Sequence, residues 1–182
     1  ETLQAQWQPH LPRLYSLQGY RYCDLLLARW RAGEVLRRAE YALRTVQQGS
    51  RNLPDMALAE LSLGRAHAAQ ARGAGADAGA HRTEARARLD AAVDGLRNAG
   101  RMDHLSRGLL ARAAFHRQTG NPDAARNDLR EVLDAAERSE MRLFLIDARI
   151  EEALQWLTPP GAPAARPSSK ACASARAALD AA

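Results

Sequence analysis

The clearest structural signal in this chain is the stretch LLARAAFHRQTGNPDAARNDLREV, residues 109–132. Gly120 is a typical helix stop, Asn121 can cap the next helix with its side chain, and Pro122 suits a first-turn position whose N–H would have no partner. Apolar residues recur at helical spacing on both sides of this turn. They are Leu109, Ala113, Ala125, Leu129 and Val132. The stretch therefore predicts two helices that fold back on each other.

The same helical period runs through almost the whole chain, and no alternating strand pattern of useful length interrupts it. We therefore predict an all-α fold with eight helices. Three glycines within residues 73–79 predict a loop between the third and fourth helices. The predicted helices cover 12–28, 33–48, a third segment that starts near Pro54 and includes Ala66, and then 83–99, 103–118, 122–137, 141–157 and 171–182.

Small residues mark the first helix of each predicted pair at Gly19, Gly64, Ala113 and Ala148, in steps of 45, 49 and 35. With the matched apolar residues of the second helices, this pattern resembles the tetratricopeptide repeat family, whose repeat is about 34 residues. The resemblance implies antiparallel helix hairpins stacked as a superhelical solenoid. Glu60 departs from it, because it stands where a large apolar residue is expected. Long-helix variants of this repeat are similar to arrays in large bacterial signalling and NTPase proteins.

Three segments follow from this pattern. Residues 1–157 are expected to form the repeat array, with about three helix pairs and a further first helix. The Pro-rich residues 158–170 are expected to be a linker, and the Ala-rich residues 171–182 a short final helix. Because the chain begins at Glu1 rather than methionine, we expect a fragment of a larger protein.

Composition excludes several classes of protein. The chain has 182 residues, 39 of them alanine and only two cysteine, so a disulfide scaffold is excluded. No apolar run approaches the roughly 18 residues that a membrane helix needs, and no basic-then-apolar leader is visible. Arginine supplies 25 of the 26 basic residues, which indicates a GC-rich bacterial genome. We therefore expect a bacterial, cytoplasmic protein that does not enter a membrane.

The sequence offers no convincing catalytic or cofactor site. Neither a GxxxxGK[ST] nor a GxGxxG loop occurs, and no HExxH or zinc-like spacing of Cys and His is present. His67 and His116 share one repeat position, where we expect partly buried packing residues rather than ligands. Glu151 and Glu152 are adjacent and diverge on a helix, and Cys23 lacks a base nearby in sequence. We therefore predict no enzymatic activity, no cofactor and no metal.

In the repeat family the first helices line a concave groove, and this resemblance implies which residues would line it here. The groove positions fall on Arg13, Ser16, Tyr20, Cys23 and Asp24, then Leu58, Leu61, Arg65, Ala68 and Ala69, then Arg107, Leu110, Ala114, Arg117 and Gln118, and last Arg142, Leu145, Arg149 and Glu152. The Lys/Asn set that clamps a chaperone's terminal carboxylate in some members is absent.

The predicted groove is rich in arginine, which suits carboxylate or phosphate groups of a partner. We predict a protein-interaction module that binds an acidic peptide or protein surface through Arg13, Tyr20, Arg65, Arg107, Arg117, Arg142 and Arg149. A nucleic-acid binder is the alternative, since the net charge is +5. Tyr20 is, however, the only aromatic residue at the groove positions where a base could stack. Packing against a parent domain is a third reading.

Overall fold

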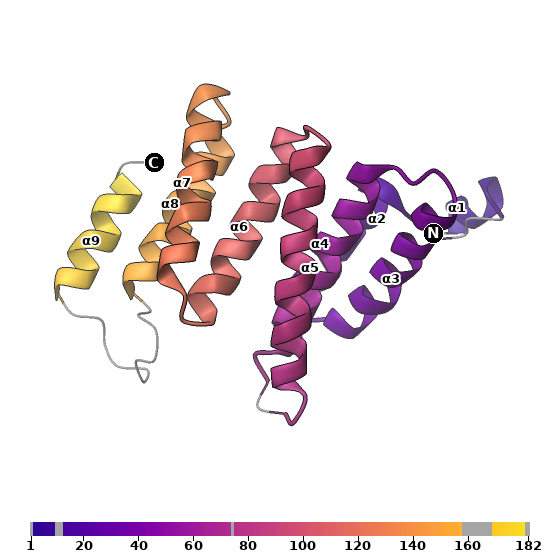
Figure 1. Ribbon diagram of the computed structural model, residues 1–182, viewed down its shortest axis with the longest axis horizontal. Coiled ribbons are helices and arrows are strands. Elements are labelled where there is room, and N and C mark those ends of the chain that lie inside the picture. The colour runs from indigo at the N-terminus through magenta and orange to yellow at the C-terminus, as the bar shows by residue number, and fades with distance from the viewer. Residues whose placement is uncertain (1, 10–12, 74, 158–168, 181–182) are drawn as a thin grey trace. The chain divides into compact units, whose positions relative to one another are not determined.

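The computed structural model is entirely helical over the residues that it describes, which are 2–9, 13–73, 75–157 and 169–180 (Figure 1). The all-α prediction is confirmed for these residues. The chain divides into two compact units, Glu1–Arg101 and Met102–Ala182. Unit 1 contains α1 (Thr2–Trp7), α2 (Ser16–Ala28), α3 (Ala32–Gln48), α4 (Leu53–Gln70) and α5 (Ala78–Asn98). Unit 2 contains α6 (Met102–Gln118), α7 (Pro122–Arg138), α8 (Arg142–Leu157) and α9 (Ser169–Asp180).

One helix was not expected, and three others begin two or more residues away from their predicted starts. The short helix α1 was not predicted, and α2 begins at Ser16, while Pro12, the predicted start, lies outside the described residues. The helix predicted over 83–99 begins at Ala78, because the N–H of His81 already bonds the carbonyl of Asp77. The final helix begins at Ser169 rather than at residue 171. Most of the predicted linker, residues 158–168, lies outside the described residues, as do residue 74 of the predicted loop and residues 181–182.

In unit 1, α4 and α5 form an antiparallel hairpin in which two glycines allow the helices to pack closely. A Cβ on Gly64 would lie 2.7 Å from Cγ of Leu89, and a Cβ on Gly95 would lie 2.9 Å from Cβ of Ala57. Both separations are too short for real atoms, so glycine allows the two helices to approach near the middle of the hairpin, at Gly64, and near its open end, at Gly95. The predicted role of Gly64 as a packing position is therefore confirmed.

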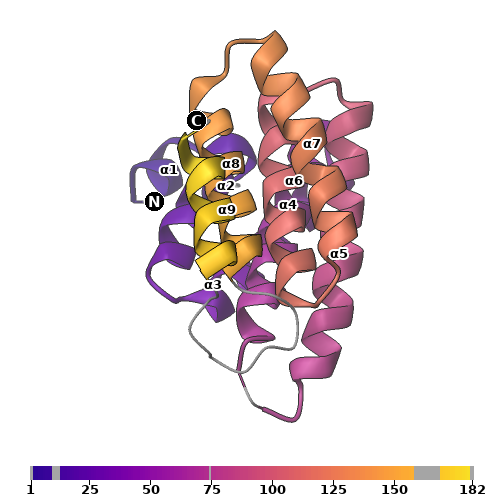
Figure 2. The same cartoon turned by 90° about the vertical axis from the view of Figure 1, so that its left-hand side faces the viewer.

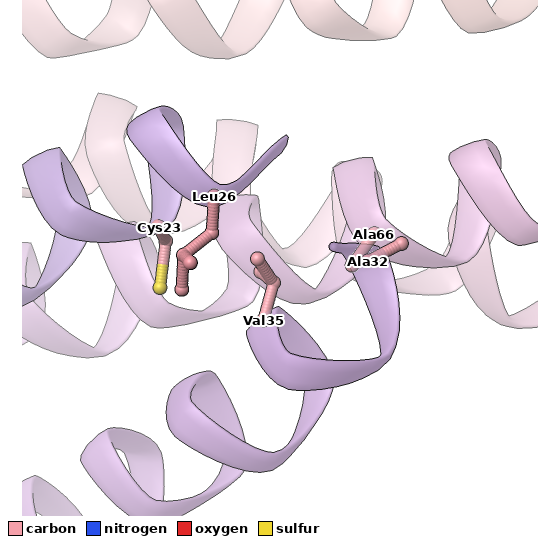
Figure 3. Close-up of a cluster of buried hydrophobic side chains, with 5 residues drawn as sticks. All are labelled: Cys23, Leu26, Ala32, Val35 and Ala66. Carbon is pink, nitrogen blue, oxygen red and sulfur yellow. The ribbon is translucent and has the colours of Figure 1, made fainter. Parts of the chain in front are cut away.

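The remaining core of unit 1 forms because α4 also packs against α2 and α3. One cluster joins all three helices through Cys23, Leu26, Ala32, Val35 and Ala66 (Figure 3). A second cluster joins α3 to α4 through Ala39, Leu43, Ala59 and Leu63. With partners on three sides, α4 buries eight of its residues. It is therefore the central helix of unit 1.

In unit 2, the predicted α6–α7 hairpin is present, and its turn has the expected chemistry. Gly120 adopts the left-handed conformation at φ +79°, and Oδ1 of Asn121 accepts a hydrogen bond from the N–H of Ala124. Ala113, Ala125 and Val132 are completely buried between the helices. No helix among the described residues of either unit is long and apolar enough to cross a membrane.

Two further helices complete unit 2. The helix α8 packs against both α6 and α7, and α9 packs against α8. Figures 1 and 2 show α9 lying alongside α8. The contact between them is made by Ala153, Ala175 and Ala178, with Leu157 beside them. Because alanine has only a methyl group to bury, this last interface is built from small surfaces.

Candidate functional site

The seven residues predicted to bind a partner divide between the two units. Arg13, Tyr20 and Arg65 belong to unit 1, and Arg107, Arg117, Arg142 and Arg149 belong to unit 2. The predicted residues therefore form two groups, one in each unit, and each group has its own surroundings.

The structure places Tyr20 in the core, not on a binding surface. Its side chain is only 5% exposed, because α2 is packed against both α3 and α4. The hydroxyl of Tyr20 lies 3.5 Å from a terminal nitrogen of Arg65, which also forms an ion pair with Asp24. Arg13 is exposed, with its guanidinium 5.2 Å from the centre of the Tyr41 ring. The prediction that Tyr20 lines a groove is wrong.

Two predicted groove positions on α4 are also buried. Leu58 and Leu61 are 2% and 0% exposed, since α4 is surrounded by α2, α3 and α5. In unit 1 the central helix therefore offers little more than Arg65, Ala68 and Ala69 at its predicted groove positions, and all three are partly buried.

Unit 2 keeps its predicted groove residues at the surface. We define the α6–α8 face by four residues of α6 and by the four residues that follow them 35 positions later on α8. These are Arg107, Leu110, Ala114 and Arg117, and Arg142, Leu145, Arg149 and Glu152. Arg142 is exposed and the other seven are partly buried. Because the two helices contact each other, this face is a single surface of one unit.

Two contacts fix the register of α6 against α8. The guanidinium of Arg107 lies 5.3 Å from the centre of the Phe144 ring, near the start of both helices. Toward their ends, Nε of Arg117 donates a hydrogen bond to Oε1 of Glu151 over 2.5 Å. Both side chains of this ion pair are largely buried. The two helices therefore run parallel, with residues of α6 beside residues about one repeat later in the chain.

The arginines of the α6–α8 face differ in what they contact. Arg117 forms an ion pair with Glu151. Arg149 donates a hydrogen bond over 2.9 Å to Glu152, one turn further along the same helix. Among the described residues, Arg107 and Arg142 form no ion pair. These two stand 35 residues apart in the sequence, Arg107 on α6 and Arg142 on α8. They are therefore the two arginines of this face that can bind a carboxylate of a partner without breaking an existing ion pair.

Sequence reasoning missed several ion pairs inside the hairpins. Asp128 of α7 is 6% exposed and receives both Nε and a terminal nitrogen of Arg112, over 2.9 and 2.8 Å. In unit 1, Arg88 donates to both oxygens of Glu60, over 3.1 and 3.0 Å, which explains why a carboxylate can occupy this apolar position. Arg88 and Asp128 stand at the same place in their repeats, one residue before Leu89 and Leu129. A charged residue directly before an inward-facing leucine was therefore the signal in the sequence that could have predicted these ion pairs.

The histidines predicted to pack between helices do so, but with an additional partner. His116 is buried, with Nε2 4.0 Å from Oδ2 of Asp128. His67 is partly buried, and its Nδ1 lies 2.9 Å from Nδ1 of His81 on α5. Among the described residues, no group of three or more His, Cys, Asp or Glu side chains is placed to hold a metal ion.

An open cleft of about 610 Å³ lies beside α1 in unit 1. Among the described residues that line it, Asp55 is the only charged one, and its Oδ1 accepts a hydrogen bond from the hydroxyl of Ser16 over 2.5 Å. A cleft whose only charge is negative is not suited to an acidic partner. The α6–α8 face is therefore the better candidate site.

Comparison of the chain with known proteins adds no relative. The resemblance to the tetratricopeptide repeat and the candidate site therefore rest on the residues of this chain. No protein-family model matches the chain, and neither a curated protein nor a solved structure matches it.

Proposed function

We propose that this chain is a non-catalytic protein-interaction module, and that the α6–α8 face binds an acidic peptide or an acidic protein surface. The observation that carries this proposal is the position of Arg107 and Arg142. They stand 35 residues apart, on two parallel helices in contact, without a carboxylate partner among the described residues. A pair of guanidinium groups in this arrangement suits two carboxylates of one bound chain.

The surroundings of Arg107 support this role. Its guanidinium lies over the Phe144 ring, 5.3 Å from the ring centre, and a side chain already held in this way loses less entropy when a carboxylate binds. Leu110 and Leu145, partly exposed, lie one turn further along α6 and α8. An apolar residue about one turn from the carboxylates of the partner would pack against them. We therefore infer that the preferred partner is a peptide that combines acidic and large apolar residues.

The test uses a fluorescein-labelled peptide of alternating Glu and Leu residues, with binding to the full chain followed by anisotropy. The double variant Arg107→Ala and Arg142→Ala should weaken binding at least tenfold, about 1.4 kcal/mol. The matched control is Arg126→Ala with Arg130→Ala, two exposed arginines on α7 that bond Asp123 and Asn127 of their own helix. Equal loss in both double variants would contradict the proposal, because it would mean that only net charge matters.

The nucleic-acid alternative makes a different prediction in the same assay. A single-stranded oligonucleotide that binds more tightly than the peptide, and that heparin displaces, would show that the arginines bind phosphates.

A labelled peptide of Glu and Ser residues tests the contribution of apolar contacts to peptide binding. It should bind more weakly than the Glu and Leu peptide if Leu110 and Leu145 contribute.

A further inference from the structure

One side of α8 in unit 2 carries an apolar stripe. Its residues recur at alternating steps of three and four, which is the spacing of the a and d positions in a coiled coil. They are Leu143, Ile146, Ile150, Ala153 and Leu157. The first three side chains are 77%, 42% and 44% exposed. A contiguous apolar stripe of this kind marks a surface that packs against another element.

Among the described residues, the second half of the stripe is covered by α9. Ala153 is buried and clusters with Ala175 and Ala178 of α9, and Leu157 packs beside them. Figures 1 and 2 show α9 lying along α8. The covered half therefore already packs against a helix, and the exposed half continues the same interface along α8.

We propose that the exposed half of the stripe is the interface of a homodimer, in which α8 of one copy packs in parallel against α8 of a second copy. A two-fold axis presents the same surface of both copies to each other. In a parallel pair, each a and d residue then packs beside its own equivalent. A stripe at this spacing is therefore complementary to itself.

The charged residues beside the stripe favour the parallel arrangement. Arg142 stands at position g, directly before the first apolar residue of the stripe, and Asp147 stands at position e, directly after the second. In a parallel pair a g residue faces the e residue five positions later on the other helix, so Arg142 of each copy faces Asp147 of the other. Both side chains are exposed, and neither forms an ion pair among the described residues. An antiparallel pair would instead bring the g positions together, and these include Arg142 and Arg149.

The exposed apolar area fits a reversible dimer. Leu179 of α9, which directly follows Ala178 of the contact with α8, adds a fourth aliphatic side chain that is 48% exposed. With the three exposed residues of the stripe it leaves roughly 400 Å² of apolar surface, close to the apolar part of the roughly 800 Å² that each partner buries in a standard interface. We therefore expect a dimer that dissociates in the micromolar range.

The experiment is sedimentation equilibrium of the full chain at concentrations from about 2 to about 200 μM. A reductant is present, because the exposed thiol of Cys172 would otherwise link two copies covalently. We expect a monomer–dimer equilibrium, and Leu143→Glu with Ile150→Glu should raise the dissociation constant at least tenfold. The matched control is Leu25→Glu with Leu53→Glu, which places the same charges on two leucines of unit 1 that are 50% and 52% exposed. It should leave the dissociation constant unchanged.

An exchange of charges tests whether a second copy is the partner. Asp147→Arg alone brings two cations together on each side of the two-fold axis and should weaken the dimer by about threefold or more. Adding Arg142→Asp restores opposite charges and should recover the dissociation constant of the parent chain. Recovery requires the two positions to face each other across a parallel pair. Far-UV circular dichroism checks that each variant keeps its helices.

Three outcomes would overturn the proposal. A parent chain that stays monomeric at about 200 μM would leave the stripe to a helix of a different protein. Equal losses in the two glutamate variants would place the interface outside the stripe. A double charge variant no tighter than Asp147→Arg would exclude the parallel pair. Arg142 also belongs to the peptide site proposed above, but no peptide is present, so these outcomes do not depend on that proposal.

Discussion

Arg117 of α6 and Glu151 of α8 form an ion pair that joins these two helices, although the two residues are 34 positions apart in the sequence. Their side chains are 16% and 12% exposed, so the pair is largely shielded from water. Asp24 of α2 and Arg65 of α4 make the same kind of connection in unit 1, across 41 residues. In both units an arginine predicted to bind a partner forms an ion pair that joins two helices, α2 with α4 and α6 with α8.

This arrangement predicts that Glu151 contributes to stability much more than its neighbour does. Glu151→Gln leaves the guanidinium of Arg117 without its charged acceptor and should lower the free energy of unfolding by about 1–3 kcal/mol. The control is Glu152→Gln, which loses a more exposed pair within one helix and should change stability by less than about 1 kcal/mol. Urea denaturation measures both. Equal effects would contradict a structural role for the pair.

The close approach at Gly64 predicts opposite effects of one substitution at two glycines. Gly64→Ala places a methyl group against Leu89 and should destabilise the chain by about 1–3 kcal/mol, although alanine favours helix. Gly79→Ala enters open space inside α5 and should stabilise the chain by up to about 1 kcal/mol. Thermal unfolding followed by circular dichroism compares them. A stabilising Gly64→Ala would mean that α4 and α5 are further apart than described.

The two cysteines should differ sharply in reactivity. Burial is the main cause that raises the pKa of Cys23 to about 11, whereas Cys172 is exposed. At pH 8 a thiol reagent should therefore modify Cys172 rapidly and Cys23 only when the chain opens. Mass spectrometry of timed samples gives both rates. Comparable rates would show that Cys23 is accessible in the folded state.

The same burial gives a pH dependence of stability. The folded chain holds Cys23 as the neutral thiol, while the unfolded chain ionises it near pH 8.5. The contribution of the buried Cys23 thiol to the free energy of unfolding is therefore complete below about pH 8.5 and is lost as the pH rises toward 11. Comparing the parent with Cys23→Ala between pH 7 and pH 10 isolates it. The gap in stability between the two should narrow as the pH rises, and a constant gap would exclude ionisation of Cys23 as the cause.

Removal of α9 should be tolerated. Only Ala175 and Ala178 of this helix are buried, so deleting residues 169–182 removes little apolar contact with α8. We expect the free energy of unfolding to fall by no more than about 2 kcal/mol. Guanidinium denaturation of the truncated chain provides the measurement. Loss of cooperative unfolding would show instead that α9 is required for the fold of unit 2.

Local signals explain which parts of the fold could be predicted. The turn at Gly120, Asn121 and Pro122 was predictable because its chemistry lies within three consecutive residues. Other turns place a residue with a side chain in the left-handed region, at Trp30 and Glu140, where no glycine precedes the change of direction. Such turns follow from how the helices pack, and a search for stop signals does not find them.

The site was less predictable than the fold, since it depends on contacts between distant residues. Tyr20 has the position of a groove residue, but its burial follows from α2 contacting two helices at once. Likewise, nothing near Arg117 in sequence shows that Glu151 will neutralise it. Only the positions of Arg107 and Arg142, one repeat apart, could be inferred from the spacing.

The central place of α4 has a consequence for how unit 1 opens. Because α4 and α5 pack closely along their length, including at Gly64 and Gly95, opening the α4–α5 hairpin breaks the most extensive helix–helix interface of unit 1. By contrast, α2 and α3 make fewer contacts with the rest and can detach while that hairpin remains. Backbone amides near Leu61 and Leu89 should therefore exchange with deuterium last in this unit, and those of α2 well before them. The hairpin would then persist as the residual structure from which unit 1 refolds.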